Sequence, residues 1–282
     1  MSVHRTSRLV MALLAGSLLV GGCSAGGEPG SGGLPVTTQV VSDATTQDIR
    51  VFAPDSEGRW PVVLALHGIG GSSQDVAELA TRLAGTGAVV FAPTYRSDLS
   101  TADGFTQATT DIVCAYRYAL AKAAEHGGDL DQPLTVVGWS LGASFSLLGG
   151  LSSTPEPAAD DPCPGDGTLP EVVVGISGCY YEYQGQPNSW FDDVSALGNK
   201  DAHVSLVAGE QDSTCPAVQS EKLAGALRGV GYDVDLTELA GADHLAPVFH
   251  EERDGQLHPA SDDAPGRQTV QVIADAIAAA QS

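Results

Sequence analysis

Basic residues are scarce in this chain of 282 residues, in which 13 lysines and arginines stand against 35 aspartates and glutamates. The formal net charge is −22. A protein that grips the phosphate backbone of a nucleic acid needs concentrated positive charge, so the composition argues against such a partner. The acidic residues are scattered rather than grouped, which favours a solvated surface over a cation site.

Three further features are missing. The apolar stretch from Leu9 to Val20 is too short to span a bilayer comfortably. No two cysteines stand at the spacing of metal ligands. Neither phosphate-binding glycine pattern, GxxxxGK[ST] or GxGxxG, occurs in the chain. We therefore expect no metal, no nucleotide and no other organic cofactor.

The N-terminus has the three-part layout of a secretory signal, with two arginines before the apolar stretch and small residues after it. Val20-Gly21-Gly22-Cys23 resembles the bacterial lipobox, in which the cysteine is lipidated and becomes the new N-terminus. We expect a signal peptide at residues 1–22 and a flexible tether at 23–35. The protein would then be exported and anchored to the membrane through Cys23. Ordinary cleavage near the same small residues, followed by secretion, is the alternative.

Four cysteines remain after Cys23, and an even number in an exported chain predicts two disulfides with three possible pairings. Cys179 and Cys215 each follow an apolar run by a few residues, so both should lie at the same end of a sheet. We therefore expect a Cys179–Cys215 bond, which leaves Cys114 to pair with Cys163.

From Pro61 onward, short apolar runs alternate with helical patterns, as in a parallel sheet covered by helices on both faces. The sequence predicts one α/β domain over residues 36–282 with about eight strands. The expected strands are Val62–Leu66, Ala88–Ala92, Leu134–Val137, Val172–Ile176, Val204–Ala208 and Val234–Leu239, after an antiparallel entry hairpin of Thr37–Val41 and Asp48–Phe52.

Helical spacing of apolar residues predicts the covering helices. The first should begin at Ser72 or Ser73 as its N-cap. The expected face of this helix consists of Val76, Leu79, Ala80 and Leu83, and the next helix should bring together Ile112, Val113, Tyr116 and Leu120. A last helix at Gln268–Ala280 should bury Val272, Ile273, Ala276 and Ile277.

The segment Gly138-Trp139-Ser140-Leu141-Gly142 follows an apolar run and precedes a run of small residues, which predicts a strand, a tight turn and a helix. A nucleophilic serine must be held rigidly, exposed and placed beside a base. In such a turn the residues two before and two after it should lack side chains, as the two glycines do. The other match, Gly22 to Gly26, lies between signal and tether without a strand or helix, and we discard it. Ser140 is the predicted nucleophile.

With this turn and order of elements, the chain resembles the α/β-hydrolase family over residues 37–282. In that family the acid and the histidine follow the serine on loops after later strands. Asp212 and His244 occupy those places here. The resemblance implies that His244 is the general base for Ser140 and that Asp212 orients its ring. Glu210 and Asp243 are the rival acids.

The family's oxyanion hole is built from two backbone N–H groups. The resemblance assigns one to Leu141, the residue after the nucleophile. The other should come from the segment His67 to Gly71, which is similar to the family's HGxGG turn. We expect Ile69 to supply it, with Gly70 in reserve, and His67 to be a buried ring bonded to the loop backbone.

Aromatic residues gather after the expected strand Val172–Ile176, where the connection often caps the site in this fold. We interpret Tyr181 and Trp190, together with Trp139 and Tyr95, as walls of a substrate pocket. Ordinary anchoring of a loop is the alternative.

These expectations describe an exported serine hydrolase that cleaves carboxylic esters through an acyl-enzyme. Three alternatives remain open. A dienelactone-hydrolase-like or polyester-degrading, cutin-type enzyme would use the same machinery, although dienelactone hydrolases usually carry cysteine where this chain has Ser140. A peptidase would also need to protonate an amine leaving group. A surface protein could have kept the fold and lost the chemistry.

Overall fold

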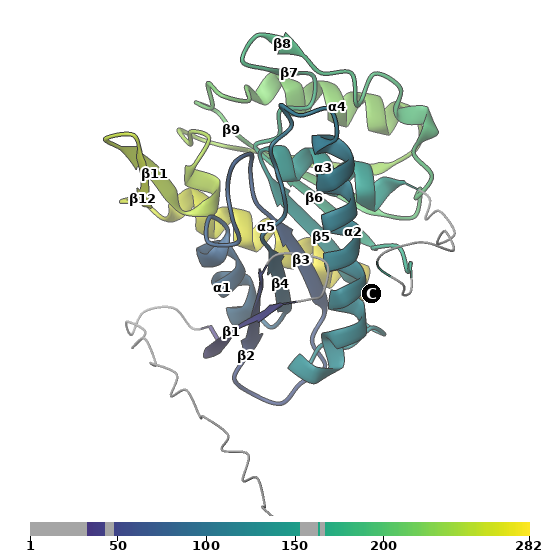
Figure 1. Ribbon diagram of the computed structural model, residues 1–282, viewed down its shortest axis with the longest axis vertical. Helices are drawn as coiled ribbons and strands as arrows, with labels where there is room; N and C mark the ends of the chain where they lie inside the picture. Colours follow the sequence, from purple (N-terminus) through teal and green to yellow (C-terminus); the bar gives the residue numbers. More distant parts are fainter. Residues whose placement is uncertain (1–32, 43–47, 153–162, 164–166) are drawn as a thin grey trace, which may run out of the picture. The chain divides into compact units, whose positions relative to one another are not determined.

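A sheet of eight strands, in the order β1-β2-β4-β3-β5-β6-β9-β10, organises the described part of the chain (Figure 1). The computed structural model describes residues 33–42, 48–152, 163 and 167–282. The expected signal peptide, most of the tether and Cys23 lie outside these residues. The strands are β1 (Val36–Ser42), β2 (Asp48–Pro54), β3 (Val62–Leu66), β4 (Val89–Pro93), β5 (Leu134–Trp139), β6 (Val172–Ile176), β9 (His203–Gly209) and β10 (Asp233–Leu239).

The strand directions confirm the predicted architecture. β1 and β2 form the antiparallel entry hairpin, and β2 also runs antiparallel to β4. The strands from β4 through β3, β5, β6 and β9 to β10 are parallel to one another. Every residue of β3, β4, β5 and β6 is buried, because helices cover the sheet on both sides. This explains why these strands read as continuous apolar runs.

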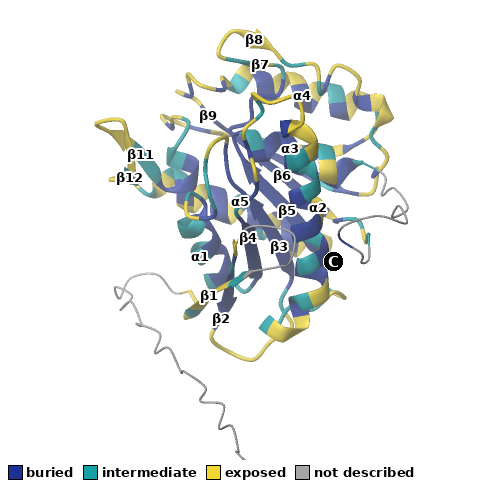
Figure 2. Ribbon diagram, in the orientation of Figure 1, coloured by how far each residue is buried: buried dark blue, intermediate teal, exposed yellow. Residues whose placement is uncertain are grey.

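Among the described residues, two helices pack on one face of the sheet and three on the other. α1 (Ala77–Gly85) and α5 (Ala264–Ala280) share one apolar core with side chains such as Val63 and Val174. α2 (Gly104–Lys122), α3 (Leu141–Leu151) and α4 (Ala217–Gly229) pack on the opposite side chains of the same strands. In Figure 2 the buried strands run between helices whose outer surfaces are exposed.

Three details of the helix prediction are wrong. The last helix, α5, begins at Ala264 and not at Gln268, because Pro265 is favourable in the first turn of a helix. α1 begins at Ala77 after Val76, not at Ser72 or Ser73. Those serines lie in a preceding turn, where Ser73 N–H donates to Thr94 Oγ1 at 3.1 Å and Ser72 N–H donates to Asp75 Oδ2 at 3.1 Å. These contacts hold the chain beside β4 before the helix can start. Val113 is 43% exposed, because it lies about 100° around α2 from buried Ile112.

The connections carry smaller elements: the hairpins β7 (Glu182–Tyr183) with β8 (Gln186–Pro187) and β11 (His250–Arg253) with β12 (Gln256–Pro259), and the 3-10 turns η1 (Ala123–His126), η2 (Val194–Ala196) and η3 (Ala246–Val248). Among the helices of the described ranges, none has the length and apolarity that a bilayer span requires.

Two disulfides join segments that are distant in the sequence. Cys114 on α2 is joined to Cys163, ahead of β6, with a Cα–Cα distance of 5.1 Å. Cys179, after β6, is joined to Cys215, ahead of α4, with a Cα–Cα distance of 4.8 Å. These are the pairs that the strand positions led us to expect.

Candidate active site

Ser140 occupies a sharp turn between β5 and α3. Its backbone has φ 58° and ψ −119°, a conformation that is costly for a residue with a side chain. The turn is possible because of its glycines. A Cβ on Gly138 would collide with the backbone of Gly142, and one on Gly142 would lie 2.5 Å from the carbonyl oxygens of Leu66 and His67. The Ser140 N–H donates to the Ile176 carbonyl at 2.9 Å, which anchors the turn to β6.

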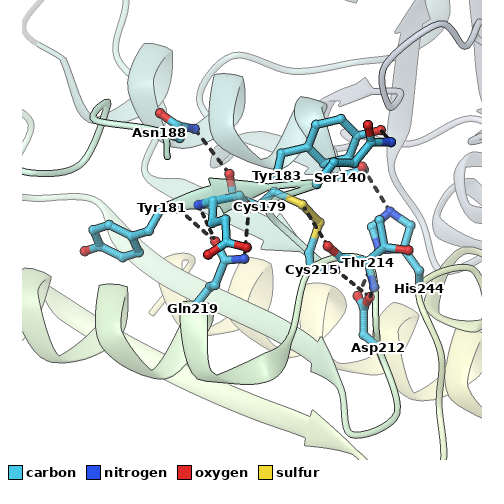
Figure 3. Close-up of a disulfide and its surroundings, with 12 residues drawn as sticks. Ser140, Cys179, Tyr181, Tyr183, Asn188, Asp212, Thr214, Cys215, Gln219 and His244 are labelled. Atoms are coloured by element: carbon cyan, nitrogen blue, oxygen red, sulfur yellow. Dashed lines mark hydrogen bonds and ion pairs between the residues drawn. A yellow bond between two sulfur atoms is a disulfide. The ribbon is translucent and has the colours of Figure 1, made fainter. Parts of the chain in front are cut away.

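Three side chains from distant parts of the sequence meet at this turn (Figure 3). His244 Nε2 lies 3.0 Å from Ser140 Oγ, and His244 Nδ1 lies 2.8 Å from Asp212 Oδ2. An ionised carboxylate only accepts hydrogen bonds, so Asp212 places the imidazole proton on Nδ1. Nε2 is then free to take the hydroxyl proton of Ser140.

The Asp212 carboxylate is enclosed by protein. Its side chain is 0% exposed, whereas that of His244 is 13% exposed. Oδ1 accepts the backbone N–H groups of Thr214 at 2.9 Å and of Cys215 at 2.8 Å. Both carboxylate oxygens are therefore engaged, and a buried charge that is paired and hydrogen-bonded in this way can be retained.

The two rival acids stabilise the backbone that carries His244. Glu210 Oε2 accepts the N–H of Gly241 at 2.9 Å. Asp243 Oδ1 accepts the N–H groups of Leu245 and Ala246, each at 3.0 Å. Their oxygens thus bind turn backbone, and the structure brings Asp212 to the His244 ring.

The loop from His67 to Gly71 lies directly against the nucleophile. A Cβ on Gly68 would stand 3.2 Å from Ser140 Cβ and 3.0 Å from the Trp139 ring. The Gly70 N–H donates to Ser97 Oγ at 2.9 Å, so it is already engaged. Leu141 is the first residue of α3, and the first N–H groups of a helix have no partner within it. Ile69 and Gly70 are the two loop donors considered from the sequence, and Ile69 is the one whose N–H does not donate to Ser97.

His67 is buried beneath this loop, as expected. Its Nε2 accepts the Tyr95 N–H at 3.2 Å, which leaves Nδ1 to donate to the Gly68 carbonyl at 2.7 Å. Burial lowers the pKa of His67 and keeps the ring neutral. The ring is therefore a support for the loop backbone.

Tyr95 is not a pocket wall, contrary to the prediction. Its side chain is 2% exposed and its ring stacks on His67 with centroids 4.1 Å apart. The hydroxyl donates to the His67 carbonyl at 2.6 Å, and burial raises the pKa of the phenol. A buried hydroxyl needs such a partner, and this one holds the ring inside the core.

Trp139 also departs from the pocket prediction. It is 6% exposed, and its indole N–H donates to the His244 carbonyl at 2.9 Å. Its ring centroid lies 5.4 Å from that of His244. Trp139 therefore supports the loop that carries the histidine.

The remaining two predicted pocket residues lie in different surroundings. In Figure 3 the Tyr181 ring points away from Ser140, and Lys222 Nζ lies 3.5 Å from its centroid. Tyr181 borders a groove of about 640 Å³ between the β7–β8 hairpin and the segment 213–222. Trp190 packs against Phe105 and Phe145, with ring centroids 5.4 and 5.8 Å away. Phe145 lies on α3, which follows Ser140.

Sequence reasoning missed Phe105 and Ser97. Phe105 is 41% exposed at the start of α2, one turn before the apolar stripe that revealed this helix. Ser97 had no signal, because only the folded loop brings it to Gly70. The neighbouring Arg96 is held by buried Asp111, whose Oδ1 accepts from the guanidinium at 2.6 Å. Within the described ranges, no three His, Cys, Asp or Glu side chains are grouped as metal ligands would be.

The topology and the positions of the three side chains define an α/β-hydrolase fold, with Ser140 after β5, Asp212 after β9 and His244 after β10. The model of the BD-FAE family matches residues 48–165, which include Ser140 but end before Asp212 and His244. No curated protein sequence matches this chain.

Solved structures of similar fold include several esterases. Propionate-bound esterase 2 of Thermogutta terrifontis has 17% identity and a TM-score of 0.63, over 88% of this chain and 94% of that chain. Esterase B of Lactobacillus rhamnosis has 16% identity and a TM-score of 0.64, over 86% of each chain. A putative dienelactone hydrolase of Klebsiella pneumoniae has 18% identity and a TM-score of 0.60, over 86% of this chain and 98% of that chain.

Proposed function

We propose that this protein is a serine hydrolase that cleaves carboxylic esters through an acyl-enzyme. The observation that carries the proposal is the continuous hydrogen-bonded series from Ser140 Oγ through His244 to buried Asp212. Such a series activates a hydroxyl that is otherwise a poor nucleophile.

The first half of the reaction forms the acyl-enzyme. Ser140 Oγ attacks the ester carbonyl carbon while His244 Nε2 takes its proton, and the carbonyl π electrons move onto oxygen. The N–H groups of Leu141 and Ile69 would stabilise that oxyanion. When the oxyanion collapses, the bond to the leaving oxygen breaks and imidazolium His244 returns the proton to the alcohol.

Water completes the cycle. His244 removes a proton from water, whose oxygen attacks the acyl carbon. Collapse of the second tetrahedral intermediate breaks the bond to Ser140 Oγ, which regains the proton from His244. The acid is released, and Asp212 stabilises the imidazolium in both halves without taking up a proton itself.

Two structural neighbours support this chemistry. The T. terrifontis esterase has been solved with propionate bound and phosphoramylated by tabun. An activated serine in this chain should likewise react with an organophosphorus probe. The dienelactone hydrolase neighbour makes dienelactones a second candidate substrate class. Rates measured on aryl esters, a dienelactone and polyester film would distinguish the candidate substrates.

Replacement of the nucleophile tests the proposal. Ser140→Ala should abolish both p-nitrophenyl acetate hydrolysis and fluorophosphonate labelling, with a nearly unchanged melting temperature. Ser144→Ala is the matched control, because this serine lies one turn along α3 and its buried Oγ has no hydrogen-bond partner among the described residues. Ester turnover by Ser140→Ala would overturn the assignment.

We also propose that the protein is exported, with a signal peptide at residues 1–22, a membrane anchor at Cys23 and a tether to residue 35. Two disulfides are typical of exported proteins and support this view. In a bacterial host, Cys23→Ala should stop incorporation of labelled palmitate and move the protein from the detergent phase to the aqueous phase. Equal labelling of both proteins would contradict the anchor.

A further inference from the structure

The Cys179–Cys215 disulfide is connected to the Asp212 carboxylate through the backbone of residue 215. The Cys215 N–H donates to Asp212 Oδ1 at 2.8 Å, and the Thr214 N–H donates to the same oxygen at 2.9 Å. These two bonds set the rotation of the carboxylate, since its other oxygen faces His244. Whatever fixes the backbone at 214–215 therefore also fixes the partner of His244 (Figure 3).

The other end of the disulfide belongs to the segment that holds Ser140. Cys179 lies three residues after Ile176, whose carbonyl accepts the Ser140 N–H at 2.9 Å. Ser177, between them, donates its N–H to the Val207 carbonyl of β9 at 2.8 Å. These bonds form a closed ring of contacts. A hydrogen bond joins Ser140 to Ile176, the chain continues to Cys179, and the disulfide joins Cys179 to Cys215. Hydrogen bonds then lead from Cys215 through Asp212 and His244 back to Ser140.

The loop that carries Asp212 has open space on one side. Ser213, Thr214 and Pro216 line the groove of about 640 Å³ that separates them from the β7–β8 hairpin. Packing from that side is therefore incomplete. On the other side Cys215 is 1% exposed and is bonded to Cys179.

We propose that the Cys179–Cys215 disulfide positions Asp212 for catalysis, in addition to stabilising the fold. The disulfide fixes the N–H groups of Thr214 and Cys215 relative to the Ser140 turn. In that position they hold Asp212 where it can bind His244 while His244 binds Ser140. This inference rests on the proposed hydrolase function. Without the bond, the 212–216 loop would relax toward the groove and the carboxylate would lose its alignment with His244.

The second disulfide supplies a matched control. Cys114–Cys163 joins α2 to the segment ahead of β6, and neither of these two segments contains Ser140, Asp212 or His244. Both bonds close loops of similar size, with sequence separations of 49 and 36 residues. Their removal should therefore destabilise the fold to a similar degree, while only one removal should affect the chemistry.

The experiment compares two double variants of the full chain, C179A/C215A and C114A/C163A, each in a Cys23→Ala background that leaves no odd thiol. C179A/C215A should lose about 10- to 100-fold in kcat, with little change in KM, because small misplacements of catalytic groups have effects of this size. C114A/C163A should melt at a lower temperature but keep the parental kcat.

The split between kcat and KM separates positioning from simple destabilisation. In C179A/C215A the fall in kcat/KM should come from kcat, because the carboxylate is displaced while the rest of the site stays in place. C114A/C163A should keep both constants and lose only thermal stability. An unchanged kcat in folded C179A/C215A would overturn the proposal.

Reduction provides a second test if C179A/C215A fails to fold. Oxidised C114A/C163A contains one disulfide, which a phosphine reductant opens to two thiols in the folded protein. The ¹H NMR signal of the His244 Nδ1 proton should broaden or vanish on reduction and return on reoxidation, and a signal that persists would contradict the proposal. Since this signal needs no turnover, an inactive parent that shows the change would refute the hydrolase function and leave the positioning role intact.

Discussion

The two loops that frame Ser140 are held in different ways. On the acid side, the loop after β9 is joined covalently to the segment that follows β6, through Cys215 and Cys179. On the oxyanion side, the loop from His67 to Val76 contains no cysteine. This loop is held by hydrogen bonds. Ser97 binds the Gly70 N–H, Thr94 binds the Ser73 N–H, and Tyr95 binds the His67 ring and carbonyl.

This difference fits the task of each side. Asp212 has one position to keep, because it sets the tautomer of His244 in every step. The oxyanion loop must meet an incoming substrate, and each of its hydrogen bonds contributes only about 1 kcal/mol net. We therefore expect single changes on the oxyanion side to have smaller, graded effects than loss of the acid.

The largest effect should come from Asp212→Asn. The amide can offer its N–H to the ring, which favours the wrong tautomer of His244, and kcat should fall on the order of 10⁴-fold. Glu210→Gln is the control, because its carboxylate binds the Gly241 N–H and not the histidine. Steady-state rates with p-nitrophenyl acetate would measure both. A larger loss in Glu210→Gln would reverse the assignment of the acid.

Gly68→Ala should have the next largest effect. The added Cβ would stand 3.0 Å from the Trp139 ring and 3.2 Å from Ser140 Cβ, so the loop must shift by a few tenths of an ångström. We expect kcat to fall about tenfold, since donors near the reacting carbonyl are sensitive to displacement. Gly225→Ala, on α4 with open space around it, should keep full activity. Equal activity in the two variants would show that the loop adapts freely.

A smaller effect is expected from Ser97→Ala, which removes the acceptor of the Gly70 N–H. The loss of one such bond, worth about 1 kcal/mol, corresponds to about a fivefold decrease in kcat. Ser97→Thr retains the hydroxyl and should restore the rate. If Ser97→Ala and the parent have the same kcat, this bond does not hold the loop in the productive position.

The smallest effect concerns the stability of the oxyanion side at low pH. Burial lowers the pKa of His67 in the folded protein, so the unfolded chain binds the proton more readily as pH falls below about 6.5. The stability contributed by the neutral ring is present above that pH and is lost below it. Melting temperatures at pH 7.5 and 5 should differ less in His67→Asn than in the parent. An equal or larger difference would mean that the low-pH loss arises elsewhere.

Much of the fold and of the candidate site could be predicted because the signals are local. The runs in β3 and β6 matched their predicted bounds, since strands buried on both faces are continuously apolar. The turn at Ser140 could be predicted from Gly138 and Gly142, because a side chain at either position would collide with neighbouring backbone atoms. The start of α1 could not be predicted, because its delay depends on the contact between Ser73 and Thr94 across two segments.

By itself, the amino-acid sequence determined the order of strands and helices, the turn that presents Ser140, and the loops on which an acid and a histidine arrive. Periodicity and glycine positions encode these features within a few residues. Only the tertiary structure decided which carboxylate meets His244, and that Tyr95 and Trp139 brace the loops instead of lining a pocket. Those choices depend on where buried donors find acceptors, and the acceptors come from segments far away in the chain.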